Sequence, residues 1–272
     1  MVTHATSATR PALRPLLLNN LIAALIGSIL MIFVHELAHL VAGLALGHPT
    51  TLYSFAAIHG DGVPADQAAF ILLIAPAFSL VSGALMQWWT PLRGRADLLH
   101  LVWLWFAFAS VQEGVAYLML TPFGAGDTGQ AAQLLGLPVL VQFLALTLGI
   151  GGMFLNARSF ATHLARHAGP EQKARNAMSL WVWLYGMIAT VLLSVLYLAV
   201  SPAQVTPGEQ VAVMAAGTVL LVFAPMANIF RAQVAEVPVE PLRIRPVPVA
   251  GLVVLGLLIG GNVLLSFGIV FD

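Results

Sequence analysis

The sequence predicts an all-α polytopic membrane protein with about seven transmembrane helices and a short β-rich segment after the first helix. Three observations favour this class. The 272-residue chain is 60% hydrophobic and only 8% charged, whereas charged residues make up about 25% of typical soluble domains. Its apolar residues form stretches long enough to cross a ~30 Å hydrocarbon core. The segment after the first stretch is instead rich in β-branched and aromatic residues, which is typical of strands.

Composition also excludes several classes of function. The chain has no cysteine, which rules out disulfides, a thiol nucleophile and a thiolate metal site. A bound metal ion would therefore need imidazole and carboxylate ligands. The formal net charge of +0 argues against nucleic acid as a partner. The lipid bilayer is the expected surrounding of this chain.

Seven apolar stretches follow a polar segment of fifteen residues. The first stretch is too long for the core of a signal peptide and lacks a small-residue cleavage site, so we expect it to be retained as a span. The stretches cover residues 16–46, 68–89, 98–120, 137–157, 179–200, 210–230 and 248–270.

The basic residues predict an orientation. Lys and Arg precede the first stretch and follow the second, fourth and sixth, while the other connections have none. The positive-inside rule then predicts a cytoplasmic N-terminus and a C-terminus outside, and we expect the plasma (inner) membrane of a bacterium. His163 and His167 would lie in a basic cytoplasmic loop, as solvated side chains.

The first stretch contains His35-Glu36-Leu37-Ala38-His39. Residues four apart share one face of a helix, so His35 and His39 can offer two imidazoles to one Zn²⁺, with Glu36 beside them as the general base. Ionisable side chains at membrane depth are costly unless they pair or bind something. The alternative is a pair of histidines hydrogen-bonded to neighbouring helices, with Glu36 as their counter-charge.

Residues 50–58 predict a strand or short hairpin that breaks at a His-Gly-Asp-Gly turn, residues 59–62. The alternative is an ordinary ordered loop. A substrate peptide could add a strand to such a hairpin, and Tyr53, Phe55 and Ala57 are the candidate substrate-binding residues. The histidine and aspartate of the turn are alternative metal ligands.

The third stretch carries Glu113 and leads into a glycine-rich segment, residues 120–130, that contains Asp127. The first and third stretches run in the same direction, so His39 and Asp127 should meet at similar depth. Two histidines and Asp127 would leave a fourth position for water, as in catalytic zinc sites.

Together these parts resemble the site-2 protease family of intramembrane zinc metalloproteases. That family has HExxH on its first core helix, then a β-rich segment, a Gly-Pro-x-x-Asn element and an Asn-x-x-Pro-x-x-x-x-Asp-Gly element. Residues 35–39 match the first element, residues 51–58 correspond to the β-rich segment, and Pro76 matches the proline of the third. Pro122 and Asp127 reproduce the spacing of the last.

The chain departs from this pattern at four positions. Ala75 and Ser79 replace the glycine and asparagine of the second-helix element, and Met119 and Thr128 replace the asparagine and glycine of the last. The resemblance covers roughly residues 25–135. It implies a core at residues 16–135, after a cytoplasmic segment at 1–15 and before four further spans at 136–272.

The resemblance implies hydrolysis of peptide bonds in membrane-embedded protein or peptide substrates. Zinc would be held by the two histidines and Asp127, Glu36 would be the base, and Ser79 and Pro122 would contact substrate. A rival pattern, similar to the membrane CaaX-prenyl proteases, takes Glu113 as third ligand, but it requires an acidic or amide residue where Tyr117 stands. Other readings are a zinc hydrolase of a lipid or small amide, and a non-catalytic membrane zinc-binding protein.

Overall fold

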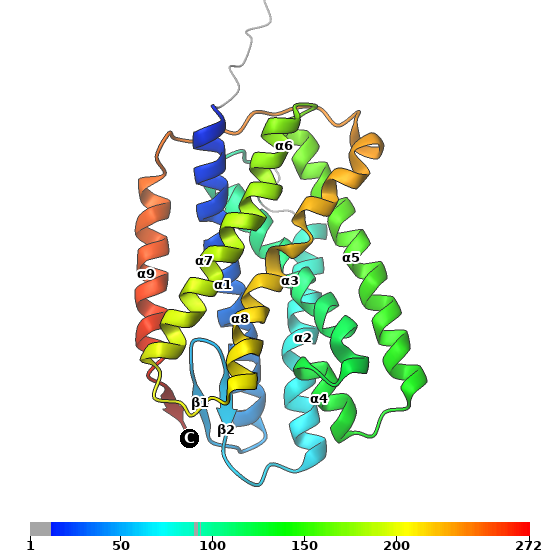
Figure 1. Cartoon of the computed structure of the whole chain (residues 1–272), viewed down its shortest axis with the longest axis vertical. Helices are drawn as coiled ribbons and strands as arrows, with labels where there is room; N and C mark the ends of the chain where they lie inside the picture. The colour runs from blue at the N-terminus through cyan, green and yellow to red at the C-terminus, as the bar shows by residue number, and fades with distance from the viewer. Residues whose placement is uncertain (1–11, 90–91, 93) are drawn as a thin grey trace, which may run out of the picture.

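The computed structural model describes residues 12–89, 92 and 94–272. Most of the expected N-terminal segment, together with Arg10 and Arg93 of the charge pattern, lies outside these residues. Within them the chain is mainly helical (Figure 1). The helices are α1 (Leu13–Ala45), α2 (Ala65–Trp88), α3 (Leu98–Leu120), α4 (Gly126–Leu134), α5 (Val139–Ala168), α6 (Gln172–Met178), α7 (Leu180–Val200), α8 (Pro207–Val222) and α9 (Val249–Leu265), with 3₁₀ segments η1 (Thr121–Phe123) and η2 (Ala224–Val234).

Six helical segments in the described part of the chain are long and apolar enough to cross a membrane. Three of these segments are the single helices α1, α2 and α5. The other three each join two elements: α3 with η1, α6 with α7, and α8 with η2. The seventh expected stretch forms α9, an apolar helix of 17 residues that is shorter than the other six. These features agree with an all-α membrane protein.

Helix α5 is longer than the sequence suggested. The expected span ended at residue 157, but α5 continues for eleven further residues to Ala168. The predicted solvated loop is therefore wrong for His163 and His167, which lie on the last turns of this helix, and His167 is buried. Of the basic residues that suggested a loop, Arg158 and Arg166 lie on α5 itself, and Lys173 and Arg175 lie on α6.

Helices α1, α2 and α3 pack closely because small residues lie where they cross. A Cβ added at Gly27 of α1 would come within 2.7 Å of the Phe106 backbone nitrogen, and one added at Gly83 of α2 within 2.7 Å of that of Val111. Small residues allow such close approach of helix backbones in membranes. The close packing fixes the positions of the side chains that these helices present to one another.

A buried polar link ties α3 to α1 and α6. The indole nitrogen of Trp105 donates a hydrogen bond to Asn20 Oδ1 at 2.7 Å, and the Asn20 amide donates to the Met178 carbonyl at 3.0 Å. All three residues are fully buried. Buried polar groups need such partners, so this link fixes the relative register of the three helices.

The predicted hairpin is present and has a third strand. Strand β1 (Thr50–Leu52) pairs with β2 (Ala57–His59), and β3 (Ile269–Phe271) pairs antiparallel with the other edge of β1. The last expected span, residues 248–270, was thus too long. Its helix ends at Leu265, and a turn with Gly268 at φ +82° leads into β3.

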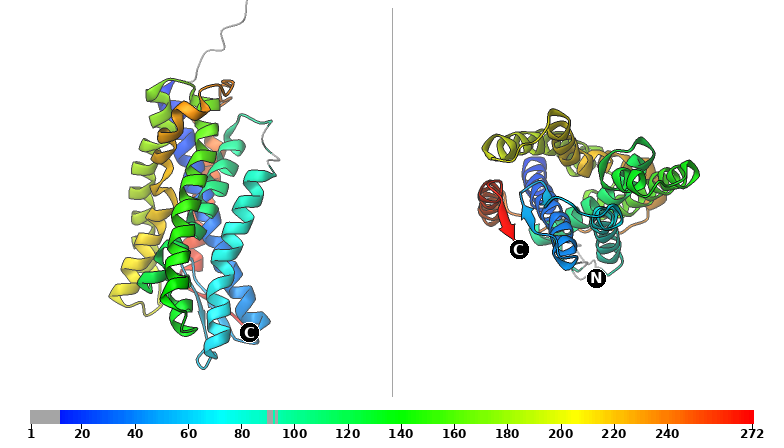
Figure 2. Two further views of the ribbon diagram at one scale, coloured as in Figure 1. Left: turned by 90° about the vertical axis from the view of Figure 1, so that its right-hand side faces the viewer. Right: turned by 90° about the horizontal axis from the view of Figure 1, so that it is seen from below.

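The two ends of the bundle differ in content. Figure 1 places the sheet, α4 and the C-terminus at the lower end, and the start of α1 and the helix α6 at the upper end. Figure 2 shows the same separation from the side, with the long helices running between the two ends. The HExxH residues lie on the lower part of α1.

Candidate metal centre

Helix α1 presents both histidines to the interior. His35 and His39 are 2% and 6% exposed, and their rings meet edge to face with centroids 4.7 Å apart. The Nε2 atoms are 3.1 Å apart. The i, i+4 spacing on one unbroken helix produces this convergence, as the sequence predicted.

Helix α4 brings Asp127 to the same point. Its Oδ2 lies 3.2 Å from His35 Nε2 and 3.2 Å from His39 Nε2. Gly126, at φ +64°, turns the chain into α4, and a Cβ there would lie 2.7 Å from the Tyr117 ring. The glycine-rich segment is therefore what allows the carboxylate to fold back against α1.

The hydrogen bonds around the two imidazoles leave three lone pairs facing one another. His39 Nδ1 lies 2.8 Å from the Ile71 carbonyl, which can only accept, so Nδ1 carries the proton. His35 Nδ1 lies 2.8 Å from Glu113 Oε1 and donates to it. In the neutral rings both Nε2 atoms are then acceptors, as is Asp127 Oδ2. Such a triangle is unfavourable unless an added proton on one ring or a metal cation offsets it.

The size of the triangle fits a metal ion. Ligand atoms ~2.0–2.1 Å from a tetrahedral zinc lie roughly 3.3 Å from one another, close to the observed 3.1, 3.2 and 3.2 Å. His35, His39 and Asp127 thus form a group that could hold a metal ion.

Glu113 lies outside this triangle. Its Oε1 faces His35 Nδ1, the ring nitrogen that points away from the shared centre. The Ser79 hydroxyl lies 3.4 Å from the same nitrogen. Carboxylates and hydroxyls in this position orient a histidine ligand and fix its tautomer. This geometry favours Asp127 over Glu113 as the third group at the centre.

Glu36 lies next in sequence to His35 and is partly buried. It interacts electrostatically with both histidines, with Asp127 and with Glu113. Three carboxylates therefore surround two imidazoles, and no Lys or Arg within the described ranges forms an ion pair with them. A bound cation would offset this concentration of negative charge.

Tyr117, which stands where the rival pattern requires an acidic or amide residue, lies against the candidate centre. Its ring stacks on His35 with centroids 5.5 Å apart and an interplanar angle of 4°, and its hydroxyl interacts with Asp127. It lies four residues after Glu113, on the same face of α3. That spacing could have indicated its position.

The candidate substrate-binding residues are spread around the sheet and η1. Ala57 lies on β2, while Tyr53 and Phe55 stack on each other in the hairpin turn at 5.9 Å. Tyr53 also packs against Gly268, before β3. Pro122 lies in η1, between α3 and α4.

The alternative ligands in the 59–62 turn do not join the centre. His59 Nδ1 is hydrogen-bonded to the Thr50 hydroxyl at 2.8 Å, and burial lowers the pKa of His59. Neither His59 nor Asp61 belongs to a metal-binding group among the residues described.

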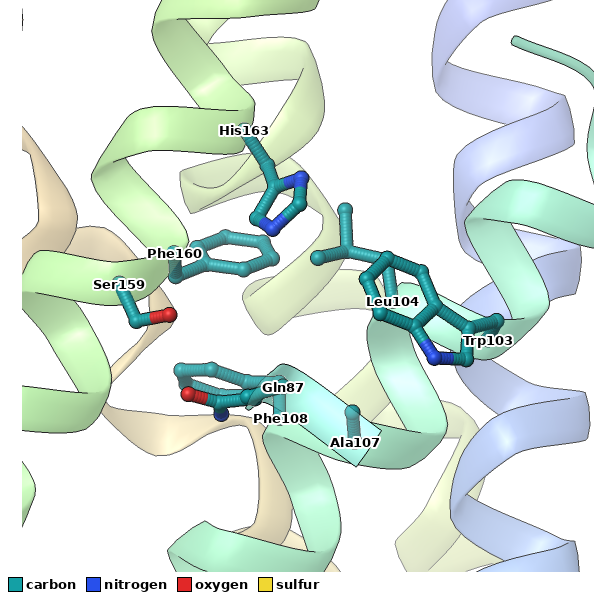
Figure 3. Close-up of a pocket in the computed structure, with 8 residues that line it drawn as sticks. All are labelled: Gln87, Trp103, Leu104, Ala107, Phe108, Ser159, Phe160 and His163. Carbon is teal, nitrogen blue, oxygen red and sulfur yellow. The ribbon is translucent and has the colours of Figure 1, made fainter. Parts of the chain in front are cut away.

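A small cavity lies elsewhere, between α2, α3 and α5 (Figure 3). Its volume of about 10 Å³ is about what one water molecule needs. Its lining residues are Gln87, Trp103, Leu104, Ala107, Phe108, Ser159, Phe160 and His163. None of the HExxH or Asp127 side chains borders it, so this cavity is not the space in which the candidate centre would meet a substrate.

Comparisons with known proteins identify no relative: no family model, curated protein or solved structure matches this chain.

Proposed function

We propose that this chain is an intramembrane zinc metalloprotease that hydrolyses peptide bonds of membrane-embedded substrates. The observation that supports it most is the convergence of His35 Nε2, His39 Nε2 and Asp127 Oδ2 within 3.2 Å of one another. Two imidazoles and one carboxylate are typical of catalytic zinc, because they leave a position for water or substrate. Glu36 supplies the base that a purely structural metal site does not need.

Zinc bound here would polarise the scissile carbonyl and lower the pKa of water towards ~7. Glu36 takes the proton from the attacking water and delivers it to the leaving amine nitrogen, so that one carboxylate serves as base and then as acid. Its carboxylate lies beside the two histidines and receives no hydrogen bond among the described residues. It is therefore available for this proton transfer.

Three further side chains hold the ligands in place. Glu113 and Ser79 fix His35 through Nδ1, and Tyr117 stacks on the His35 ring while its hydroxyl reaches Asp127. These are positioning residues, which act through the ligands. Ser79, expected from the sequence to contact substrate, is better placed for this role because its side chain is buried against His35.

The outer edge of β2 could accept an extended substrate. Strands β2 and β3 lie on the two sides of β1, so both are outer strands of the sheet. Hydrogen bonds join Tyr53 to Ala56 and Gly60 to Pro49. Because bonded pairs alternate in antiparallel strands, the backbone groups of Ala57 and His59 point away from β1. These groups could pair with an unwound substrate segment.

The test is Glu36→Gln in purified protein reconstituted into lipid bilayers. Bound zinc is measured by elemental analysis, and turnover with a panel of quenched-fluorescence single-span peptides. We expect one zinc to remain at the HExxH centre and turnover to fall roughly 10²–10⁴-fold, since this is the usual contribution of a general base.

The matched control is Glu236→Gln, which removes an exposed carboxylate outside the site and should leave turnover unchanged. Unchanged peptide turnover in Glu36→Gln would contradict the assigned base. A zinc-loaded wild type that cleaves lipid amides but no peptide would instead support the hydrolase alternative.

A further inference from the structure

A second cluster of histidines lies at the opposite end of the bundle. His100, on the first turn of α3, meets His163 and His167 from the last turns of α5. One nitrogen from each ring lies within 4.8 Å of the others. His100 and His167 are 0% and 5% exposed, and His163 is partly buried. His163 and His167 are the two histidines that were expected from the sequence to lie in a solvated loop.

Backbone carbonyls fix the tautomers of two of these rings. His100 Nδ1 lies 2.9 Å from the Leu92 carbonyl, and His167 Nδ1 lies 2.9 Å from the Glu240 carbonyl. Carbonyls only accept, so each Nδ1 donates and each neutral ring has a lone pair on Nε2. Histidines that bind metals are oriented by this same kind of hydrogen bond from the other ring nitrogen.

The two lone pairs face each other. His100 Nε2 and His167 Nε2 are 3.0 Å apart, a separation that requires either an extra proton on one ring or a cation between them. His163 completes the third side, with its ring centroid 5.9 Å from that of His100. Three neutral imidazoles converge here, as two imidazoles and a carboxylate do at the HExxH centre.

Two acidic groups near the cluster have basic partners. Asp97 accepts from Arg95 Nε at 2.9 Å and Glu240 accepts from Arg166 Nε at 2.9 Å, and these guanidinium groups lower the pKa of both carboxyls. Neither carboxylate is left to stabilise a charged imidazolium in the cluster. Burial itself disfavours that charged form, so a metal ion explains the close nitrogens better than a proton.

We propose that His100, His163 and His167 form a second metal site, for a divalent transition-metal ion of the class that prefers imidazole, represented by Zn²⁺. The donor set contains three nitrogens and no thiolate or carboxylate, which suits zinc, copper or nickel rather than magnesium or calcium. A fourth ligand could be water, since His163 borders the one-water cavity of Figure 3.

This site is a metal clip between α3 and α5 rather than a catalytic centre. Its inner ligands come from two helices. Its outer hydrogen bonds reach the segment before α3, through Leu92, and the segment before α9, through Glu240. Among the residues described, Asp97 and Glu240 are each paired with an arginine rather than with a ring of the cluster. Occupation would therefore fix four parts of the chain relative to one another.

The test counts zinc per chain in the purified full-length protein. We expect two zinc ions in the wild type, one in His35→Ala/His39→Ala, one in His163→Ala, and none when the two changes are combined. His48→Ala, which removes a histidine outside both clusters, should keep two. His167→Asn offers a second variant, because its amide can still donate to the Glu240 carbonyl, and it should also keep one.

Binding of Co²⁺ provides an independent test of the three-histidine site. In His35→Ala/His39→Ala, added Co²⁺ should produce the visible absorption bands of a four-coordinate nitrogen site, and these should vanish when His163→Ala is added.

The failures of the two proposed sites are distinguishable. A wild type with one zinc that disappears in His35→Ala/His39→Ala overturns the clip and leaves the proposed protease intact. Two zinc ions retained in both His163→Ala and His167→Asn would also overturn the clip. Loss of a single zinc only in the His163 and His167 variants would support the clip and contradict the catalytic centre.

Discussion

At the scale of single residues, the ring nitrogen that each carboxylate faces distinguishes a candidate ligand from a supporting residue. Asp127 and Glu113 both contact His35, at 3.2 and 2.8 Å, and the shorter contact is not the one that points to the shared centre. Asp127 faces Nε2, where His39 also converges, whereas Glu113 faces Nδ1. Ranking the two carboxylates by distance alone would put Glu113 first, although it faces away from the shared centre.

This difference predicts opposite effects of two substitutions. Asp127→Ala removes one of three ligands, so we expect the zinc of the HExxH centre to be lost. Glu113→Gln keeps a hydrogen-bond partner for His35 but weakens its orientation, which should lower zinc affinity roughly 10–100-fold. Zinc content and competition with a chelator measure both.

The matched control is Asp61→Ala, an exposed aspartate in the 59–62 turn, which should bind zinc as the wild type does. Retention of zinc in Asp127→Ala together with its loss in Glu113→Gln would assign the third ligand to Glu113 and favour the rival pattern.

Sequence reasoning predicted that His35, His39 and Asp127 converge, because helical spacing and parallel spans place them without long-range information, and the structure brings the three together. It did not find Tyr117 as a site residue, or the role of Ser79 beside His35. Those assignments depend on how α2 and α3 are rotated against α1, which side-chain packing decides and local periodicity does not.

At the scale of elements, the start of α4 is the part of the centre most sensitive to backbone change. Gly126 has φ +64°, and a Cβ added there would lie 2.7 Å from the Tyr117 ring. Gly126→Ala adds the cost of a left-handed backbone, about 1–2 kcal/mol, and pushes against Tyr117, a neighbour of Asp127. We expect a lower melting temperature and weaker zinc binding.

Gly136→Ala is the matched control for that substitution. Gly136 also has a positive φ, +59°, but a Cβ there meets nothing within 4 Å. It should lower stability through the backbone term alone and leave zinc binding unchanged. Equal zinc affinity in the two variants would show that the close contact with Tyr117 does not hold Asp127 in place.

Element boundaries could be predicted only where local signals are strong. The hairpin was found from its β-branched residues and its glycine turn. Strand β3 was missed because Ile269–Phe271 continues an apolar run, and nothing local indicates that it pairs with a strand more than 200 residues earlier. The end of α5 was missed because arginines suit an amphipathic helix end as well as a loop.

At the scale of the whole molecule, the two groups that could hold a metal ion lie at opposite ends of the same bundle. The HExxH centre shares its end with the sheet and α4, and the three-histidine cluster lies near α6 and its basic residues (Figure 1). If the positive-inside rule holds, the first faces the outside and the second the cytoplasm. The bundle itself does not decide which end is which, since helix packing is the same either way up.

Labelling of single cysteines in intact cells tests this orientation, and the cysteine-free chain gives no background. Asp61→Cys reports on the end with the HExxH centre and Gln172→Cys on the end with the three-histidine cluster, because both positions are exposed. A membrane-impermeant maleimide should label Asp61→Cys in intact cells, and Gln172→Cys only after the membrane is permeabilised. The reverse pattern would place the proposed protease centre on the cytoplasmic side and the metal clip outside.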